Sequence, residues 1–193
     1  MTLAEKVRSV EEVFQALDLE ITAFKQWSGL QCSYGCGKCC LKPDIHATVL
    51  EFLPLAYRLY KEQKAYALYE QLSTSAEGPC VHYDNERAGG KCGAYEARGL
   101  ICRLFGYSAR INKYQQADIM TCSVIKTEQA APFQQAVVLI GLGERSVPVA
   151  SRYYMQLMGI DDELSRTSYP INTAIRKALE TVMHYYAYDE NRE

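Results

Sequence analysis

The sequence predicts a mostly α-helical protein, in which helices surround an irregular, cysteine-rich metal-binding centre with at most a small β-hairpin. Long stretches towards both ends repeat apolar residues at steps of three and four, which is the spacing of one helix face. All eight cysteines fall between residues 32 and 122, where turn residues separate short segments. We therefore expect a single domain over residues 1–193, with a metal-binding region at 32–122 and flanking helices at 1–31 and 123–193.

The first two helices are predicted from apolar periodicity and from start signals. Over residues 3–28 a single apolar stripe contains Val7, Val10, Phe14, Leu17, Ile21 and Phe24. A second helix is predicted over residues 48–73. Thr48 and Glu51 have the spacing of a capping box at its start, and Pro54 either kinks this helix or marks its first turn.

Shorter elements are predicted for the rest of the chain. A short helix over 95–105 carries Cys102, and a small hairpin over 107–120 turns around Asn112 and Lys113. Beyond the last cysteine the helical spacing returns. It predicts helices at about 127–141, 146–158 and 171–187.

The cysteines indicate a metal site. Cys32, Cys36, Cys39 and Cys40 lie within nine residues, and a C-x-x-C turn such as 36–39 can direct two sulfurs at one ion. Side chains of adjacent residues diverge in most backbone conformations. We therefore expect Cys39 and Cys40 to serve different irons of a cluster or different ions rather than one mononuclear ion; a spare thiol is the alternative for one of the two. The predicted metal ligands are Cys32, Cys36, Cys39, Cys40, Cys80, Cys92, Cys102 and Cys122.

The remaining composition narrows the classes of function. An even number of cysteines would also suit disulfides, but the N-terminus lacks the apolar core of a secretory signal, so a reducing, cytoplasmic location is expected. The formal net charge of −2 and the absence of a basic run argue against nucleic-acid binding. No apolar run approaches the length that a bilayer requires, so no membrane association is expected.

The cysteine spacing and its flanking residues resemble the CxxCxxCC cysteine-cluster family, also called YkgJ-like, a zinc- or iron-chelating domain. The matching residues are Cys36-Gly-Lys-Cys39-Cys40, then Cys80, then the run from Lys91-Cys92 through Tyr95, Arg98 and Cys102-Arg103 to Phe105, and finally Cys122. Two departures occur within this region. Three residues rather than two separate Cys32 from Cys36, and Gly99 stands where the family usually has proline. The resemblance implies metal binding.

Two kinds of metal centre are compatible with the residues. Sulfur ligands suit an iron–sulfur cluster, with [4Fe–4S] favoured, and they also suit zinc, for which eight thiolates would fill two closed sites. Arg98 and Arg103 are predicted to contact the cofactor and offset the charge of an anionic cluster; ordinary salt bridges are the alternative for both arginines. His82 follows Cys80 closely, but we expect it to be a surface or hydrogen-bonded histidine rather than a ligand.

We expect the cysteine cluster to hold an iron–sulfur centre used for electron transfer or for metal or cluster handling, with a protein or redox partner that the sequence does not identify. One alternative is a structural zinc-binding interaction protein. A second is a cluster-dependent modification enzyme similar to flagellin lysine-N-methylase, a relative that carries a similar cysteine cluster. No nucleophile, base and orienting acid can be placed together from the sequence, so no catalytic residues are predicted.

Overall fold

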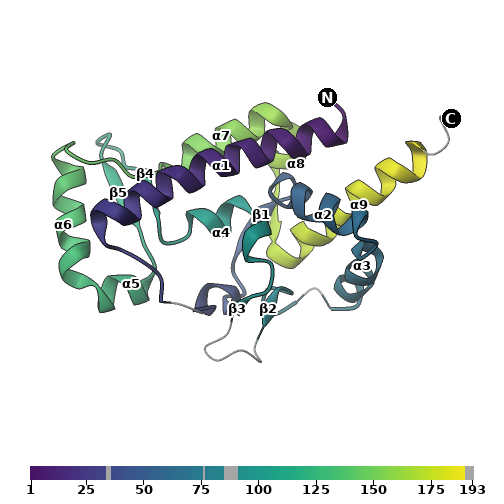
Figure 1. Ribbon diagram of the computed structural model, residues 1–193, viewed down its shortest axis with the longest axis horizontal. Coiled ribbons are helices and arrows are strands. Elements are labelled where there is room, and N and C mark those ends of the chain that lie inside the picture. Colours follow the sequence, from purple (N-terminus) through teal and green to yellow (C-terminus); the bar gives the residue numbers. More distant parts are fainter. Residues whose placement is uncertain (34–35, 76, 85–90, 190–193) are drawn as a thin grey trace. The chain divides into compact units, whose positions relative to one another are not determined.

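The predicted fold class is confirmed. The structure is a computed structural model that describes residues 1–33, 36–75, 77–84 and 91–189. Within these residues it contains nine α-helices, three short 3-10 helices and three two-stranded antiparallel sheets (Figure 1). No helix in this part of the chain combines the length and apolar composition needed to cross a bilayer.

The chain forms two compact units, each assembled from separate stretches of sequence. The first unit contains residues 1–12, 35–99 and 157–193, and the second contains residues 13–34 and 100–156. The expectation of a single domain stays a prediction. It is tested by whether the protein unfolds in urea in a single transition that is the same for different probes.

The first unit is built around the C-terminal helix. It contains the start of α1 (Leu3–Ser28), then η1 (Lys38–Leu41), β1 (His46–Thr48), η2 (Leu50–Phe52), α2 (Leu53–Lys61), α3 (Ala65–Thr74), β2 (Tyr83–Asp84), β3 (Lys91–Cys92), η3 (Tyr95–Ala97), the end of α7 (Ala150–Ile160), α8 (Asp162–Arg166), β6 (Ser168–Pro170) and α9 (Ile171–Asp189). The helix α9 packs against α2 and α3. The strands β1 and β6, far apart in sequence, pair with Ala47 opposite Tyr169.

The predicted helix over 48–73 is present but interrupted. The backbone N–H of Thr48 donates to the Glu51 carboxylate at 2.8 Å, which is one half of the predicted capping box, but the residue that caps η2 is Val49, and its side chain makes no cap bond. Pro54 lies in the first turn of α2, where a proline costs no hydrogen bond. The prediction of one continuous helix was wrong, because Gln63 adopts a left-handed φ of 59° between α2 and α3.

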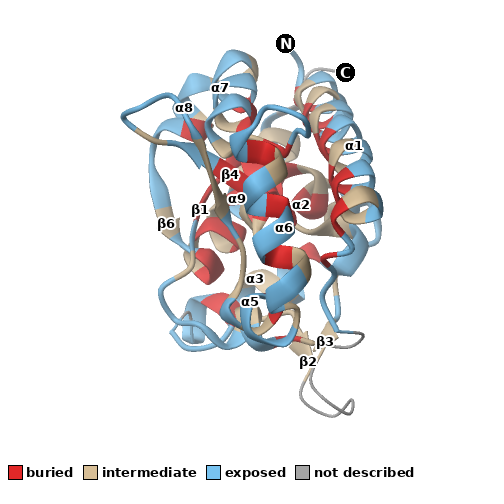
Figure 2. Cartoon of the chain, turned by 90° about the vertical axis from the view of Figure 1, so that its left-hand side faces the viewer, coloured by how far each residue is buried: buried red, intermediate tan, exposed pale blue. Residues whose placement is uncertain are grey.

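The second unit contains most of α1 and the predicted hairpin. Its other elements are α4 (Leu100–Leu104), β4 (Ser108–Ile111), β5 (Ala117–Met120), α5 (Ser123–Glu128), α6 (Ala130–Gly141) and the start of α7. The strands β4 and β5 pair with Ser108 opposite Met120, so the hairpin prediction is confirmed. The predicted apolar stripe of α1 is buried, and Figure 2 shows the buried positions recurring along one side of this helix.

Several helix boundaries differ from the predictions for a local reason. The expected helix over 127–141 is divided into α5 and α6 at Gln129, whose φ of −124° and ψ of 44° are not helical. The expected helix at 146–158 begins only at Ala150. Residues before it are extended, since the Pro148 carbonyl accepts the Ala109 N–H at 2.8 Å beside the hairpin. Such contacts between distant residues override local periodicity.

We expect Asp161→Ala to lower the free energy of unfolding by about 1–2 kcal/mol at pH 7. Asp161 accepts the Leu164 N–H at 3.0 Å as the cap of α8, and Lys6 Nζ lies 2.6 Å from its carboxylate. Burial alone would raise the pKa of Asp161, but the Lys6 contact and the backbone N–H groups outweigh it and lower the pKa below 3.8. The ionised form is therefore the stabilising form.

The sign of this shift fixes the pH dependence. The pKa of Asp161 is lower in the folded state than in the unfolded state. Its contribution to the free energy of unfolding is therefore complete above the pKa of the unfolded state and is lost as the pH falls through the pKa of the folded state. Urea unfolding of wild type and variant from pH 7 down to pH 2 should show the two stabilities converging. Asp162→Ala, at a more exposed carboxylate on the same helix, is the control. A difference that is constant over this range would contradict the prediction.

Candidate metal centre

Four cysteines of the first unit lie on segments that the backbone holds together. Cys39 and Cys40 are in η1, Cys80 precedes β2, and Cys92 ends β3. The Cys80 N–H donates to the Cys40 carbonyl at 2.9 Å, and Tyr83 N–H donates to the Cys80 carbonyl at 2.8 Å. In the small β2–β3 sheet Tyr83 is opposite Cys92. These bonds link all three cysteine-bearing segments.

The sulfurs of these cysteines are also in contact. Cys40 is hydrogen-bonded to the sulfurs of both Cys39 and Cys92, and charge on Cys92 or Cys39 raises the pKa of Cys80. We call Cys39, Cys40, Cys80 and Cys92 the first thiol set. The expectation that the adjacent Cys39 and Cys40 side chains diverge was wrong. They lie in a tight 3-10 turn, closed by a 2.9 Å bond from the Cys40 N–H to the Gly37 carbonyl.

Backbone N–H groups point at the sulfurs of the first thiol set. The N–H of His82 donates to the Cys80 sulfur, and the N–H of Ala94 donates to the Cys92 sulfur. Each donor comes two residues after its cysteine. Hydrogen bonds of this kind stabilise thiolates and are a usual feature of metal-bound cysteines. The donor set therefore fits a thiophilic metal.

The protonation of the first thiol set is uneven. The hydrogen bond from Cys40 lowers the pKa of Cys39 to about 6 and that of Cys92 to about 7. The pKa of Cys40 itself is raised, because its proton lies between those two sulfurs. Burial raises the pKa of Cys80 to about 11. Two of the four sulfurs are thus disposed to be thiolates near neutral pH, and a metal favours the deprotonated form of all four.

The two predicted cofactor-binding arginines lie in different units. In the first unit, the charge of Arg98 lowers the pKa of Cys39 and Cys92, and its guanidinium lies 3.6 Å from the centroid of the Tyr95 ring. In the second unit, Arg103 forms an ion pair with Asp18 and is buried. The electrostatic effect of Arg98 on the thiols is direct, whereas a role of Arg103 towards a cofactor stays a prediction.

The other four predicted ligands lie outside the first thiol set. Cys36 belongs to the first unit, and Cys32, Cys102 and Cys122 belong to the second. Among the described residues, no three His, Cys, Asp or Glu side chains already converge on one metal position. Metal binding by the first thiol set therefore requires its sulfurs to rotate inwards. A change of cysteine rotamer moves a sulfur without displacing the backbone.

Sequence reasoning missed Asn172, which holds the loop that carries Cys80. Its Oδ1 accepts the Val81 N–H at 2.8 Å, and its Nδ2 donates to the Pro79 carbonyl at 2.9 Å. The side chain is 3% exposed. One amide thus bonds the backbone on both sides of Cys80, from a helix far along the chain. The only signal in the sequence is an asparagine within the apolar repeat of residues 171–187.

We interpreted His82 as a surface or hydrogen-bonded side chain, and for one of its two ring nitrogens this interpretation was wrong. Its Nε2 is buried, and no described residue hydrogen-bonds it. Burial, together with the nearby charge of Arg58, lowers its pKa and keeps the ring neutral. A buried ring nitrogen without a partner is costly, by about 1–3 kcal/mol, unless another group satisfies it. This nitrogen lies only two residues from Cys80.

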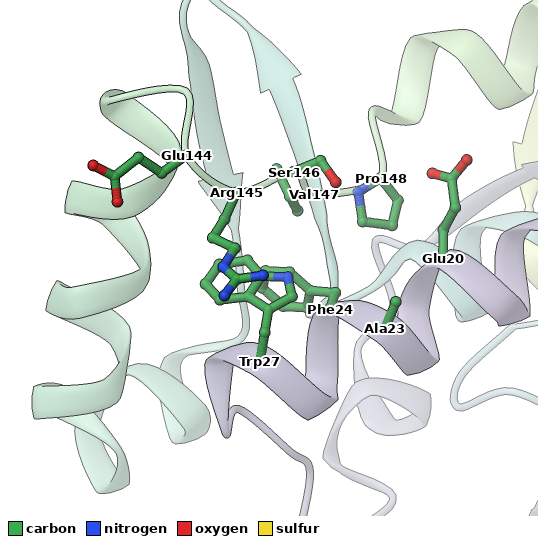
Figure 3. Close-up of a pocket in the computed structure, with 9 residues that line it drawn as sticks. All are labelled: Glu20, Ala23, Phe24, Trp27, Glu144, Arg145, Ser146, Val147 and Pro148. Carbon is green, nitrogen blue, oxygen red and sulfur yellow. The ribbon is translucent and has the colours of Figure 1, made fainter.

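The second unit also contains a pocket of about 290 Å³. Arg145 extends towards Trp27 on one side of it, and Glu20 stands apart on the other (Figure 3). The carboxylate of Glu20 accepts a hydrogen bond from Tyr153 and lies 3.8 Å from Arg152. None of the nine lining residues is a cysteine or a histidine. The pocket is therefore not part of a thiol site, and its carboxylate is paired within the protein.

A helical fold that groups four thiols with N–H donors has the features of a cysteine-rich metal-binding domain. Residues 31–125 belong to the CxxCxxCC family, described as "Putative zinc- or iron-chelating domain", so the resemblance read from the sequence is confirmed. The first thiol set lies entirely within the matched residues. No curated protein and no solved structure matches the chain at a significant level.

Gly99, which replaces the usual proline of this family, is needed for close packing. A Cβ at Gly99 would lie 2.8 Å from Phe52 Cζ and 3.3 Å from Glu51 Cβ. Both neighbours are buried, at 3% and 1% exposed. We expect Gly99→Ala to lower the free energy of unfolding by about 1–3 kcal/mol, because the core has no space for the methyl group. Urea unfolding measures this.

The control is Gly159→Ala, which lies near the end of α7 in the same unit. A Cβ there meets nothing within 4 Å. Since alanine is the better helix former, this variant should gain about 0.5–1 kcal/mol. If Gly99→Ala were as stable as wild type, the close approach to Phe52 would not restrict this position.

Proposed function

We propose that the protein binds a metal through the first thiol set, with Cys39, Cys40, Cys80 and Cys92 as four thiolate ligands of one centre. The observation that carries this proposal is the contact of the Cys40 sulfur with the sulfurs of Cys39 and Cys92, with Cys80 close enough to feel their charges. The family match supports metal binding in general. The N–H groups directed at the sulfurs support thiolates in particular.

A mononuclear centre of zinc or iron is the simplest occupant of four thiolates, because such a metal forms a closed tetrahedral site with four cysteine sulfurs. Bound there, the metal would join η1, the Cys80 loop and the β2–β3 sheet. This supports a structural role, in which the centre fixes the surface of an interaction protein.

An iron–sulfur cluster is the second candidate, with electron transfer or cluster handling as its function and a redox protein as its partner. Arg98 favours it, because this cation already acts on two thiols and would offset the negative charge of a cluster. Hydrogen bonds to the sulfurs would tune its potential. A cytoplasmic, reducing location suits free thiolates in either case. The modification-enzyme alternative stays a prediction that requires an open iron site.

The experiment is metal and acid-labile sulfide analysis of protein purified without oxygen, for wild type and Cys92→Ala. Zinc or iron without sulfide would support the mononuclear centre. Iron and sulfide in equal amounts would support the cluster. In either case Cys92→Ala should hold the metal of this centre more weakly, and a chelator that leaves wild type loaded should remove it. A wild-type protein that binds no thiophilic metal, or a Cys92→Ala variant that resists the chelator as well as wild type does, would overturn the proposal.

A further inference from the structure

We infer that the pocket of the second unit binds a small organic anion with a flat apolar ring, in which Arg145 holds the negative group and Trp27 contacts the ring. The pocket has a volume of about 290 Å³, at the lower end of the range of ~300–1,000 Å³ that is usual for small-molecule sites. None of its lining residues is a cysteine or a histidine. The inference therefore goes beyond the proposed metal binding and does not depend on it.

One wall of the pocket is a single face of α1. Its residues Glu20, Ala23, Phe24 and Trp27 occupy positions i, i+3, i+4 and i+7, which lie together on one side of a helix. Phe24 is buried and Trp27 is half-buried. Their ring centroids are 5.2 Å apart and their planes meet at 89°, an edge-to-face contact that holds the indole in place. The pocket thus has a fixed aromatic surface against which a ligand ring can pack.

The other wall is the segment 144–148 between α6 and α7, which backbone hydrogen bonds hold at both ends. At its start, the Leu139 carbonyl accepts the N–H groups of Glu144 and Arg145, at 3.0 and 3.3 Å. At its end, the Ala109 N–H donates to the Pro148 carbonyl at 2.8 Å. The base of the Arg145 side chain is therefore positioned before any ligand arrives, which lowers the entropic cost of binding.

Arg145 is the only cation among the nine lining residues. No residue in the described part of the chain forms a hydrogen bond or an ion pair with its guanidinium. Two carboxylates line the same pocket, but Glu20 is engaged by Tyr153 and Arg152, and Glu144 points away from Arg145 (Figure 3). The guanidinium is thus left to an outside partner, and its planar fork of N–H groups suits a carboxylate or a phosphate.

These two lining groups together select the class of ligand. A negative group alone would leave the aromatic wall in contact with water, and a neutral ring alone would leave Arg145 without a partner. A ligand that carries both gains from burial of apolar area against Trp27 and from charge-assisted hydrogen bonds to Arg145. A cationic group on the ligand is not favoured, because Glu20 already has partners within the protein.

The ordinary explanation of this pocket is a hollow in the surface whose arginine is only solvated. The test uses the single tryptophan of the chain, because the fluorescence of Trp27 reports directly from the pocket wall. The probes are benzoate and phenyl phosphate, which carry both features, with benzyl alcohol and inorganic phosphate, which carry one each. We expect a saturable change of fluorescence with the first two probes and none with the other two at the same millimolar concentrations.

Two variants identify the groups that bind. Arg145→Gln should weaken the binding of benzoate by ~10–100-fold, because it removes charge-assisted hydrogen bonds. The matched control is Arg110→Gln, an exposed arginine of the same unit outside the pocket, which should bind as wild type does. Trp27→Leu should weaken binding by ~2–10-fold. This last variant is followed by isothermal titration calorimetry, since it lacks the fluorophore, and circular dichroism checks its helical content.

Four results would overturn the inference. The first is that neither fluorescence nor calorimetry detects binding of benzoate or phenyl phosphate to the wild-type protein. The second is that Arg145→Gln binds them unchanged, and the third is that benzyl alcohol binds as tightly as benzoate. The fourth is that inorganic phosphate binds as tightly as phenyl phosphate, since the ring would then have no part. The tighter of the two ring-bearing probes shows which negative group the pocket prefers. Metal content, measured on the same protein, tests the proposed function separately.

Discussion

Replacing Cys40 by alanine is expected to weaken metal binding at the first thiol set on the order of 100-fold. Structural zinc sites contribute ~10–16 kcal/mol of binding free energy, so one of four ligands accounts for roughly 3 kcal/mol. Cys40 should matter at least as much as its partners, because its sulfur contacts those of both Cys39 and Cys92. Competition titration with a chromogenic chelator gives the affinity.

The neighbouring residue provides the matched control. Leu41 lies in the same 3-10 turn and is 45% exposed, so Leu41→Ala should retain the affinity of wild type. If Cys40→Ala also retained that affinity, the contacting sulfurs would not be the ligands. The proposal of a four-thiolate centre would then have to be abandoned in favour of a different cysteine set.

Replacing Asn172 by alanine should weaken metal binding by ~10–100-fold, because this side chain holds the backbone on both sides of Cys80. The variant leaves the Val81 N–H and the Pro79 carbonyl without their partners, on both sides of Cys80. Each unsatisfied buried group costs about 1–3 kcal/mol, so the free energy of unfolding should fall as well. The affected loop is the one that carries the most buried ligand of the first thiol set.

Two measurements separate positioning from general stability. The first is the affinity for zinc, and the second is the free energy of unfolding in urea with metal removed. Glu180→Ala, an exposed site on the same helix, should change neither. If Asn172→Ala lowered stability while leaving the affinity unchanged, Asn172 would hold the fold but not the metal ligand.

Elements that depend on neighbouring residues were predictable from the sequence. The helix over 3–28 and the helix beginning at 171 follow from apolar spacing, and the hairpin over 107–120 was found in the expected place. The bond between Thr48 and Glu51 was read from a spacing of three residues. In each case the interactions that form the element join residues of one short, continuous stretch of the chain.

The tertiary structure decided which cysteines meet. The sequence identified the cysteines and the family, but the contact of Cys40 with Cys92 depends on strands and turns between distant segments. The tertiary structure also brought Asn172 beside Cys80 and left His82 Nε2 buried. Local spacing carries no information about such contacts, because they arise only when the path of the whole chain is fixed. The sequence alone therefore indicated the kind of ligand, and the fold decided which of the cysteines lie near one another.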